Sequence, residues 1–150
     1  MHIILYQPQI PQNTGNIIRS CKALNAKLTL VRPIGFSLNA RQMKRAGLDY
    51  HNDVEIELID DLESYLKELT KPFYFFSSKV SQSYSDVKYE SDAVLIFGSE
   101  TTGLPQHLFD TYHDRFVTLP MAEGARCLNL SNTVAIAAYE MQRQLNFSLL

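Results

Sequence analysis

The amino-acid sequence predicts an α/β fold in which a mostly parallel sheet carries helices on both faces. Strand-like apolar runs alternate with helical segments along the chain, and residues 1–33 already form a β-α-β pattern. The length of 150 residues favours a single domain, residues 1–150, which is long enough to bury a proper core. The apolar fraction of 45% and the charged fraction of 20% are typical of a soluble globular protein.

The β-α-β pattern opens with the apolar run His2–Gln7, which predicts a buried strand that two prolines bring to an end. Asn13–Asn16 follows as a turn or helix cap, Ile17–Leu24 continues as a helix, and Lys27–Pro33 is a second strand. The polar stretch Asn13–Asn16 therefore lies at the carboxyl end of a strand, where ligands bind in open α/β sheets. It matches neither G-x-G-x-x-G nor the Walker A pattern, so a standard phosphate loop is not supported.

The middle of the chain continues the alternation. One segment alternates in polarity like an edge strand, an aspartate can cap the helix after it, and an aromatic run predicts a further strand. In chain order we expect a short basic helix at Leu38–Ala46, a strand at Val54–Leu58, a helix from Asp60 or Asp61 to about Leu69, a strand at Phe73–Ser77 and a polar loop at Ser78–Glu90.

The last third begins with Asp92–Gly98, an apolar run that predicts a central strand. A loop with two glycines follows, and glycine eases tight turns and close approach of a ligand to the backbone. Pro105 favours a helix start, so Gln106–Thr111 is expected to be helical. Phe116–Leu119 is the last expected strand, and a loop from Pro120 leads to the C-terminal segment.

The stretch Leu128–Phe147 predicts a long terminal helix. Asn129 or Ser131 can cap it, because a short side-chain oxygen accepts an otherwise unpaired backbone N–H. Its apolar residues recur at spacings of three and four and form one stripe, Val134, Ala138, Met141 and Leu145. The segment fits an ordinary packing helix, and its positive N-terminal end also suits an anion or an electron-rich group.

Three polar loops each follow an expected strand, at Gln12–Asn16, Gly98–Leu104 and Pro120–Cys127. If they lie at the same edge of the sheet, their polar side chains converge on one site. The candidate residues are Asn13, Asn16, Arg19, Glu100, Arg126, Asn129, Ser131 and Asn132. The pattern predicts a site and leaves its chemistry open.

Several functional classes find no support in the sequence. The four histidines share no ligand spacing, and Cys21 and Cys127 lie far apart without a C-x-x-C pattern, so we expect reduced thiols and no metal site. Ser99 and Ser131 lack a nucleophile-elbow context, which argues against a hydrolase. No apolar run approaches the ~20 residues of a membrane span, and the start does not resemble a signal peptide. We therefore expect a cytoplasmic protein with no membrane partner.

The charge is unevenly distributed although the net charge is only −2. Residues 1–50 hold seven Lys and Arg against one acidic residue, whereas residues 51–150 hold seven against fifteen. A basic half can meet a polyanion even when the whole chain is acidic. Solvated surface explains the same distribution equally well, so both interpretations stay open.

Four segments together resemble a known family. They are Asn13–Cys21 (NTGNIIRSC), Lys44–His51 (KRAGLDYH), Leu95–Pro105 (LIFGSETTGLP) and Leu119–Gln144, which contains ARCLNLSN. They are similar to the motifs of the SPOUT class of RNA 2′-O-methyltransferases, and most similar to its minimal TrmL-like (YibK-like) tRNA (cytidine/uridine-2′-O-)-methyltransferases. The resemblance implies a C-terminal trefoil knot, a homodimer and S-adenosylmethionine as cofactor. It further implies methyl transfer to the ribose 2′-hydroxyl of the wobble nucleotide, cytidine or modified uridine, in leucine tRNA anticodons.

The resemblance also implies roles for individual residues. The expected cofactor-binding residues are Phe76, Gly98, Leu119, Met121, Cys127, Leu128 and Asn132. In the expected catalytic set, Arg19 acts on the acceptor side and Tyr139 reaches the partner subunit's site. The other members are expected to hold the loops and Arg19 in place, and they are Asn13, Glu100, Asn129 and Ser131. Arg41, Lys44 and Arg45 are expected to bind RNA. Arg19 either has a perturbed pKa, or polarises the hydroxyl while another group takes the proton.

Three positions depart from the pattern that the family implies. Ser99 stands where the family commonly has proline, Thr102 where it has arginine, and Cys127 where it has serine. Three alternatives therefore stay open beside the wobble-nucleotide enzyme. They are a 2′-O-methyltransferase for another tRNA or ribosomal RNA position, a catalytically silent RNA-binding dimer, and a flavodoxin-like nucleotide or signalling module.

Overall fold

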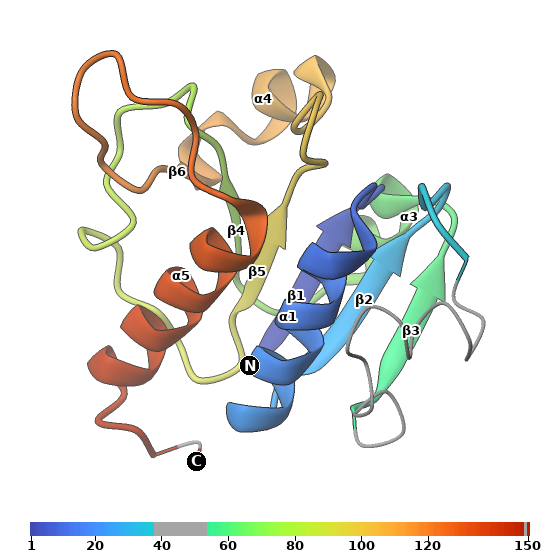
Figure 1. Ribbon diagram of the computed structural model, residues 1–150. Coiled ribbons are helices and arrows are strands. Elements are labelled where there is room, and N and C mark those ends of the chain that lie inside the picture. The colour runs from blue at the N-terminus through green and yellow to red at the C-terminus, as the bar shows by residue number, and fades with distance from the viewer. Residues whose placement is uncertain (38–53, 149) are drawn as a thin grey trace.

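A computed structural model describes residues 1–37, 54–148 and 150. Its six strands form one sheet in the order β3-β2-β1-β5-β4-β6 (Figure 1), and every pairing between them is parallel. The strands are β1 His2–Tyr6, β2 Lys27–Val31, β3 Ile56–Ile59, β4 Phe73–Phe76, β5 Val94–Phe97 and β6 Phe116–Val117. The predicted parallel sheet is confirmed, with β5 in its interior and β3 at its edge.

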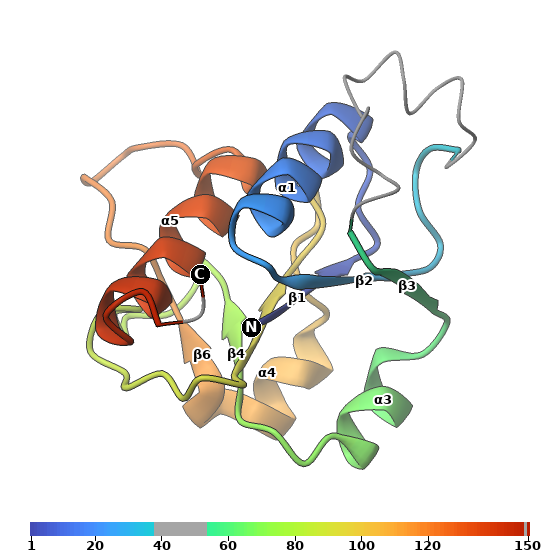
Figure 2. The same cartoon turned by 90° about the horizontal axis from the view of Figure 1, so that it is seen from below.

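Helices cover both faces of the sheet, as the sequence predicts. Helices α1 (Pro11–Ala23) and α5 (Leu130–Gln144) lie side by side on one face, while α3 (Leu62–Glu68) and α4 (Gln106–Tyr112) lie on the other (Figure 2). The 3₁₀ turn η1 (His113–Arg115) joins α4 to β6. None of the helices in the described residues is both long and apolar enough to cross a membrane.

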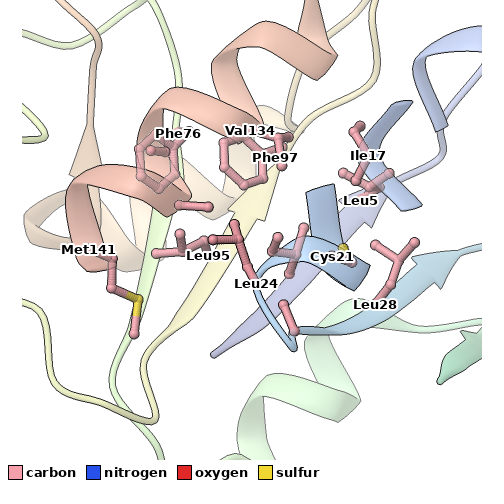
Figure 3. Close-up of a cluster of buried hydrophobic side chains, with 14 of the residues drawn as sticks. Leu5, Ile17, Cys21, Leu24, Leu28, Phe76, Leu95, Phe97, Val134 and Met141 are labelled. Atoms are coloured by element: carbon pink, nitrogen blue, oxygen red, sulfur yellow. The ribbon is translucent and has the colours of Figure 1, made fainter. Parts of the chain in front are cut away.

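The core has one layer on each face of the sheet. On the α1 and α5 face, Ile17 and Cys21 of α1 and Val134 and Met141 of α5 are fully buried against the strands (Figure 3). Each large aliphatic side chain buried in this way stabilises the fold by about 1.5–3 kcal/mol. The predicted apolar stripe of the terminal helix is therefore the surface that fixes α5 on the sheet.

The structure corrects several element boundaries. Asn13–Asn16 is not a turn, because α1 begins at Pro11 and contains these residues in its first turns. Proline at the first helical position has a suitable φ and no N–H to leave unpaired. The edge strand β3 begins at Ile56, two residues later than the expected start at Val54. Strand β6 ends at Val117 and not at Leu119 as expected.

At the C-terminal helix, the capping residue is Asn129 and not Ser131. The Asn129 side chain accepts a hydrogen bond from the Ser131 backbone N–H, and α5 ends at Gln144. The short helix expected at Leu38–Ala46 lies outside the described residues.

His2, at the amino end of β1, is only 6% exposed. Its Nε2 lies 2.7 Å from Thr29 Oγ1, and the Thr29 hydroxyl donates to Glu57 Oε2 at 3.0 Å. Burial, with a further contribution from Lys27, lowers the pKa of His2 to about 4, against an opposing effect of Glu57. The imidazole is therefore neutral in the folded protein at neutral pH.

Acid is expected to destabilise the fold through His2. His2 has a pKa near 6.5 in the unfolded chain and about 4 in the folded protein. Between these pH values the unfolded state therefore binds one more proton at His2 than the folded state does. The free energy of unfolding should therefore fall by about 2 kcal/mol from pH 7 to pH 5. Urea unfolding at both pH values measures this loss. His2→Gln should remove it and His113→Gln, at an exposed position, should retain it; equal losses in all three proteins would contradict the assignment.

Candidate functional site

The three predicted polar loops meet at the carboxyl edge of the sheet. They surround a pocket of about 460 Å³ between the ends of β4, β5 and β6 and the start of α5. Asn13 contributes from α1, Gly98–Leu104 from the loop after β5, and Met121 and Cys127 from the loop before α5. The predicted convergence of these segments is confirmed.

Glu100 fastens the loop after β5 to the start of α1. Its Oε2 accepts from the Gln9 backbone N–H at 2.8 Å, and its Oε1 accepts from the Ile10 N–H and from Asn13 Nδ2, both at 3.1 Å. A carboxylate is favoured at this position because the amino end of a helix carries partial positive charge. A residue some ninety positions away thus caps α1, since Ile10 at the capping position makes no side-chain cap.

Asn13 carries the connection on to α5. Its Oδ1 accepts from Asn129 Nδ2 at 2.8 Å, and Asn129 Oδ1 accepts from the Ser131 backbone N–H at 2.9 Å and from Ser131 Oγ at 2.7 Å. Because Glu100 can only accept, the orientation of both amides is determined along the chain. Glu100, Asn13, Asn129 and Ser131 form one hydrogen-bonded series that joins all three segments.

Gly98 makes the loop after β5 compact. A Cβ atom at this position would lie 2.4 Å from the Gly103 carbonyl carbon and 2.6 Å from the Leu104 nitrogen. Ser99 and Gly103 exchange two backbone hydrogen bonds of 3.2 and 3.0 Å across this approach. Ser99 Oγ lies 2.7 Å from Thr102 Oγ1. Two of the departures from the family pattern therefore contact and satisfy one another.

Part of the pocket lining is an apolar wall. Phe76 and Leu119 are buried there, Met121 is half-buried and Leu128 is 42% exposed. The Phe76 ring stacks on Phe97 with centroids 4.5 Å apart. A pocket with one apolar wall and polar groups around its rim suits a flat heterocycle that carries polar substituents.

The exposed Cys127 closes part of the rim. Its Sγ lies 3.2 Å from Ser78 Oγ, which joins the loop before α5 to the end of β4. Ser78 and its neighbour Lys79 line the pocket, although the sequence reasoning passed over them. They directly follow a parallel strand, so the rule that located the other three loops would also have found them.

Other predicted residues lie outside the pocket. Arg19 is exposed on α1, six residues beyond Asn13 and so about 9 Å further along the axis. Asn132 and Tyr139 are exposed on α5, and Ser131 is buried behind the rim. Arg41, Lys44 and Arg45 lie outside the described residues. Across residues 1–37 and 54–148, no group of three His, Cys, Asp or Glu side chains is placed to hold a metal ion.

Residues 1–139 match the model of the SpoU rRNA Methylase family. The chain belongs to this family. A tRNA (cytidine(34)-2′-O)-methyltransferase of Methylovorus glucosotrophus is 42% identical to this SpoU methylase. The alignment covers 97% of the present chain and 96% of the relative. The predicted relation to TrmL-like 2′-O-methyltransferases is thereby confirmed.

Solved structures give the same result for the fold of the SpoU methylase. One, described as structural insights into the 2-OH methylation of C/U34 on tRNA, has a TM-score of 0.89 and 38% identity, covering 97% of this chain and 96% of its own. An AdoMet-bound rRNA methyltransferase from Sinorhizobium meliloti has a TM-score of 0.84 and 25% identity. The alignment covers 96% of this chain and 56% of that one. The shared part is therefore the α/β unit described above.

Proposed function

We propose that this SpoU methylase transfers a methyl group from S-adenosylmethionine to the ribose 2′-hydroxyl of nucleotide 34, the wobble position, in tRNA. The observation that carries the proposal is the convergence of three hydrogen-bonded segments on one pocket with an apolar wall. The names of the 42% identical relative and of the 38% identical structure support the acceptor. The AdoMet-bound structure supports the donor.

The pocket residues fit S-adenosylmethionine. A volume of about 460 Å³ is in the range of pockets for ligands of this size. Phe76, Leu119 and Leu128 offer apolar contact to an adenine ring, and Gly98 lines the same pocket. Met121 and Cys127 line the remaining rim, whereas Asn132 would act through the start of α5 and not by direct contact.

The bound donor supplies an electrophilic methyl group, so the protein has to place the acceptor oxygen and assist loss of its proton. We assign the acceptor side to Arg19. A guanidinium is a poor proton acceptor, so Arg19 polarises the hydroxyl and holds a neighbouring phosphate. In this proposal the target ribose lies between Asn13 and Arg19. Asn13, Glu100, Asn129 and Ser131 keep α1 at the correct distance from the pocket.

A second copy of the chain completes the site in this proposal. Ile136 and Tyr139 lie three residues apart on one side of α5 and are 41% and 47% exposed. Two large apolar side chains on adjacent turns suit burial against another helix. In such a homodimer, Tyr139 would reach the acceptor site of the partner.

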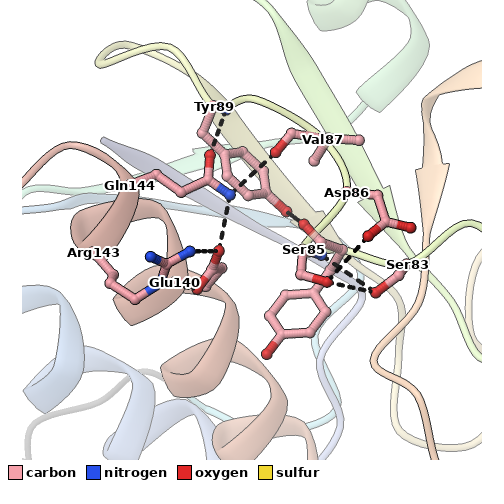
Figure 4. Close-up of polar contacts among 9 residues, drawn as sticks. Ser83, Ser85, Asp86, Val87, Tyr89, Glu140, Arg143 and Gln144 are labelled. Carbon is pink, nitrogen blue, oxygen red and sulfur yellow. Dashed lines mark hydrogen bonds and ion pairs between the residues drawn. The ribbon is translucent and has the colours of Figure 1, made fainter.

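A C-terminal trefoil knot is also part of the proposal. The segment between β4 and β5 pairs with the end of β6 at Ser83 and Thr118. The last turn of α5 is held against the same segment, where Gln144 donates from Nε2 to the Val87 carbonyl and accepts from the Tyr89 N–H, both at 3.1 Å (Figure 4). Contacts of one loop with both β6 and the C-terminal helix are compatible with a chain threaded through that loop.

We further infer that leucine tRNAs are the acceptors, that Arg41, Lys44 and Arg45 contribute to binding them, and that the enzyme acts in the cytoplasm. The +6 balance of residues 1–50 supports an RNA-binding role for that half. The two free thiols, Cys21 and Cys127, suit a reducing compartment.

Methyl transfer to defined tRNAs tests the proposed function. Purified protein is incubated with labelled S-adenosylmethionine and unmodified leucine tRNA transcripts, and the labelled nucleotide is mapped by nuclease digestion and mass spectrometry. We expect label at the 2′-oxygen of nucleotide 34. A transcript that carries a 2′-deoxynucleotide at this position is the matched control and should remain unlabelled. Label at another nucleotide or in ribosomal RNA would contradict the acceptor, and absence of label from every RNA would contradict the activity.

A further inference from the structure

We propose that Lys79 is a positioning residue that binds the carboxylate of the methionyl tail of S-adenosylmethionine. The inference rests on the proposed function and specifies how one end of the donor is recognised. Among the described residues that line the pocket, Lys79 is the only Lys or Arg, and Glu100 is the only acidic residue. The two charges differ in their surroundings, and this difference carries the argument.

The charge of Glu100 is already compensated, whereas that of Lys79 is not. Three N–H groups donate to the Glu100 carboxylate. The partner of the Lys79 ammonium is the Phe109 ring, with Nζ 5.8 Å from its centroid, and no carboxylate of the described residues pairs with it. A cation–π contact at this distance and exposure is weak and leaves the ammonium able to bind an anion.

The backbone of Lys79 is held in place at the pocket. Its N–H donates to Ser77 Oγ at 3.2 Å, and the Ser77 N–H donates to the Val117 carbonyl at 3.0 Å. Ser78, between them, contacts Cys127 across the rim at 3.2 Å. The backbone of Lys79 therefore holds a fixed position after β4, and its exposed side chain extends from there.

The position of Lys79 favours the donor carboxylate over an RNA phosphate. S-adenosylmethionine carries a sulfonium and an ammonium group, both cationic, and a single anionic group, its carboxylate. The sulfonium is repelled by a lysine, so the carboxylate is the end that approaches Lys79. Arg19 and Asn13 lie on α1, after β1, whereas Lys79 follows β4, and β5 separates these strands in the sheet. The proposed acceptor site at Arg19 and the residue Lys79 therefore follow strands that are not neighbours in the sheet.

Removing the charge from either partner tests the proposal. Isothermal titration calorimetry measures binding of S-adenosylmethionine and of decarboxylated S-adenosylmethionine to the unaltered protein, Lys79→Gln, Lys79→Arg and Lys88→Gln. The unaltered protein should bind the intact donor about tenfold more tightly than the decarboxylated one, as expected for a charge-assisted hydrogen bond. Lys79→Gln should lose this preference because it weakens binding of the intact donor only. Lys79→Arg and the exposed control Lys88→Gln should retain it.

Three results would overturn the assignment. If Lys79→Gln weakens binding of both donors equally, Lys79 has a structural role. If Lys79→Gln leaves binding of both donors unchanged, Lys79 has no role in donor binding. If Lys79→Gln weakens binding of tRNA in the absence of donor and keeps the preference for the carboxylate, Lys79 binds an RNA phosphate instead. Failure of the unaltered protein to bind either donor would contradict the proposed function itself, and is distinguishable from these results because Lys79 is then intact.

Discussion

Gly98→Ala is expected to eliminate detectable methyl transfer and to lower the free energy of unfolding by about 3 kcal/mol. The new methyl group would lie 2.4 Å from a backbone carbon of Gly103, so the loop after β5 has to move away from the sheet. Backbone cannot rotate away as a flexible side chain can. Movement of this loop also displaces Glu100, and with it the cap of α1. Urea unfolding and calorimetry with S-adenosylmethionine measure the two effects.

The matched control for Gly98 is Gly124→Asn. Gly124 lies in the loop before α5 with a φ of +75°, and nothing lies within 4 Å of a Cβ built on it. Asparagine tolerates this conformation better than other residues with a side chain, so the cost should stay within about 1 kcal/mol. If Gly98→Ala binds the donor as the unaltered protein does, the close approach of the loop is not required for the site.

Arg19→Ala is expected to lower kcat for tRNA methylation by about 10³-fold, in the range found for removal of a group that stabilises charge in the transition state. The dissociation constant for S-adenosylmethionine should not change, because Arg19 does not line the pocket. Arg19→Lys keeps the charge without the planar fork of donors and should recover part of the rate. Single-turnover kinetics with saturating tRNA separates the chemical step from RNA binding.

Lys22→Ala is the control for Arg19, since Lys22 is exposed on α1 three residues further along. It should leave the single-turnover rate unchanged within about twofold. Full turnover of Arg19→Ala with tight RNA binding would remove Arg19 from the acceptor site. An equal loss in both variants would indicate general electrostatic attraction of RNA and no specific role for the guanidinium.

The architecture was predictable because its signals are local. Each strand is a short apolar run and α5 has a continuous apolar stripe, so the alternation of elements and the meeting of three loops at one edge follow from the sequence. The start of α1 was not predictable in the same way. Asn13–Asn16 has the composition of a turn, and the carboxylate that holds the segment just before the helix, Glu100, is supplied from a distant loop.

The candidate site was predictable to a similar extent. Motif resemblance led to Gly98 and Leu119 in the pocket wall, but it indicated neither which polar groups bond to one another nor how far Arg19 lies from the pocket. The contact between Ser99 and Thr102 is also invisible in the sequence, where each residue is a separate departure from the family pattern. Lys79 also follows a parallel strand, so its place at this sheet edge was predictable, but a single lysine in a polar loop gives no local signal for a ligand.

The series of hydrogen bonds that begins at Glu100 restricts which ligands the sheet edge can receive. Parallel α/β sheets that bind nucleotide phosphates do so with free N–H groups at helix amino ends. In this protein Glu100 accepts from the N–H groups of Gln9 and Ile10 just before α1, the first helical residue Pro11 has no N–H, and Asn129 accepts from the Ser131 N–H in the first turn of α5. The protein's own side chains thus hold N–H groups of the kind that dinucleotide sites in comparable sheets leave free for phosphate.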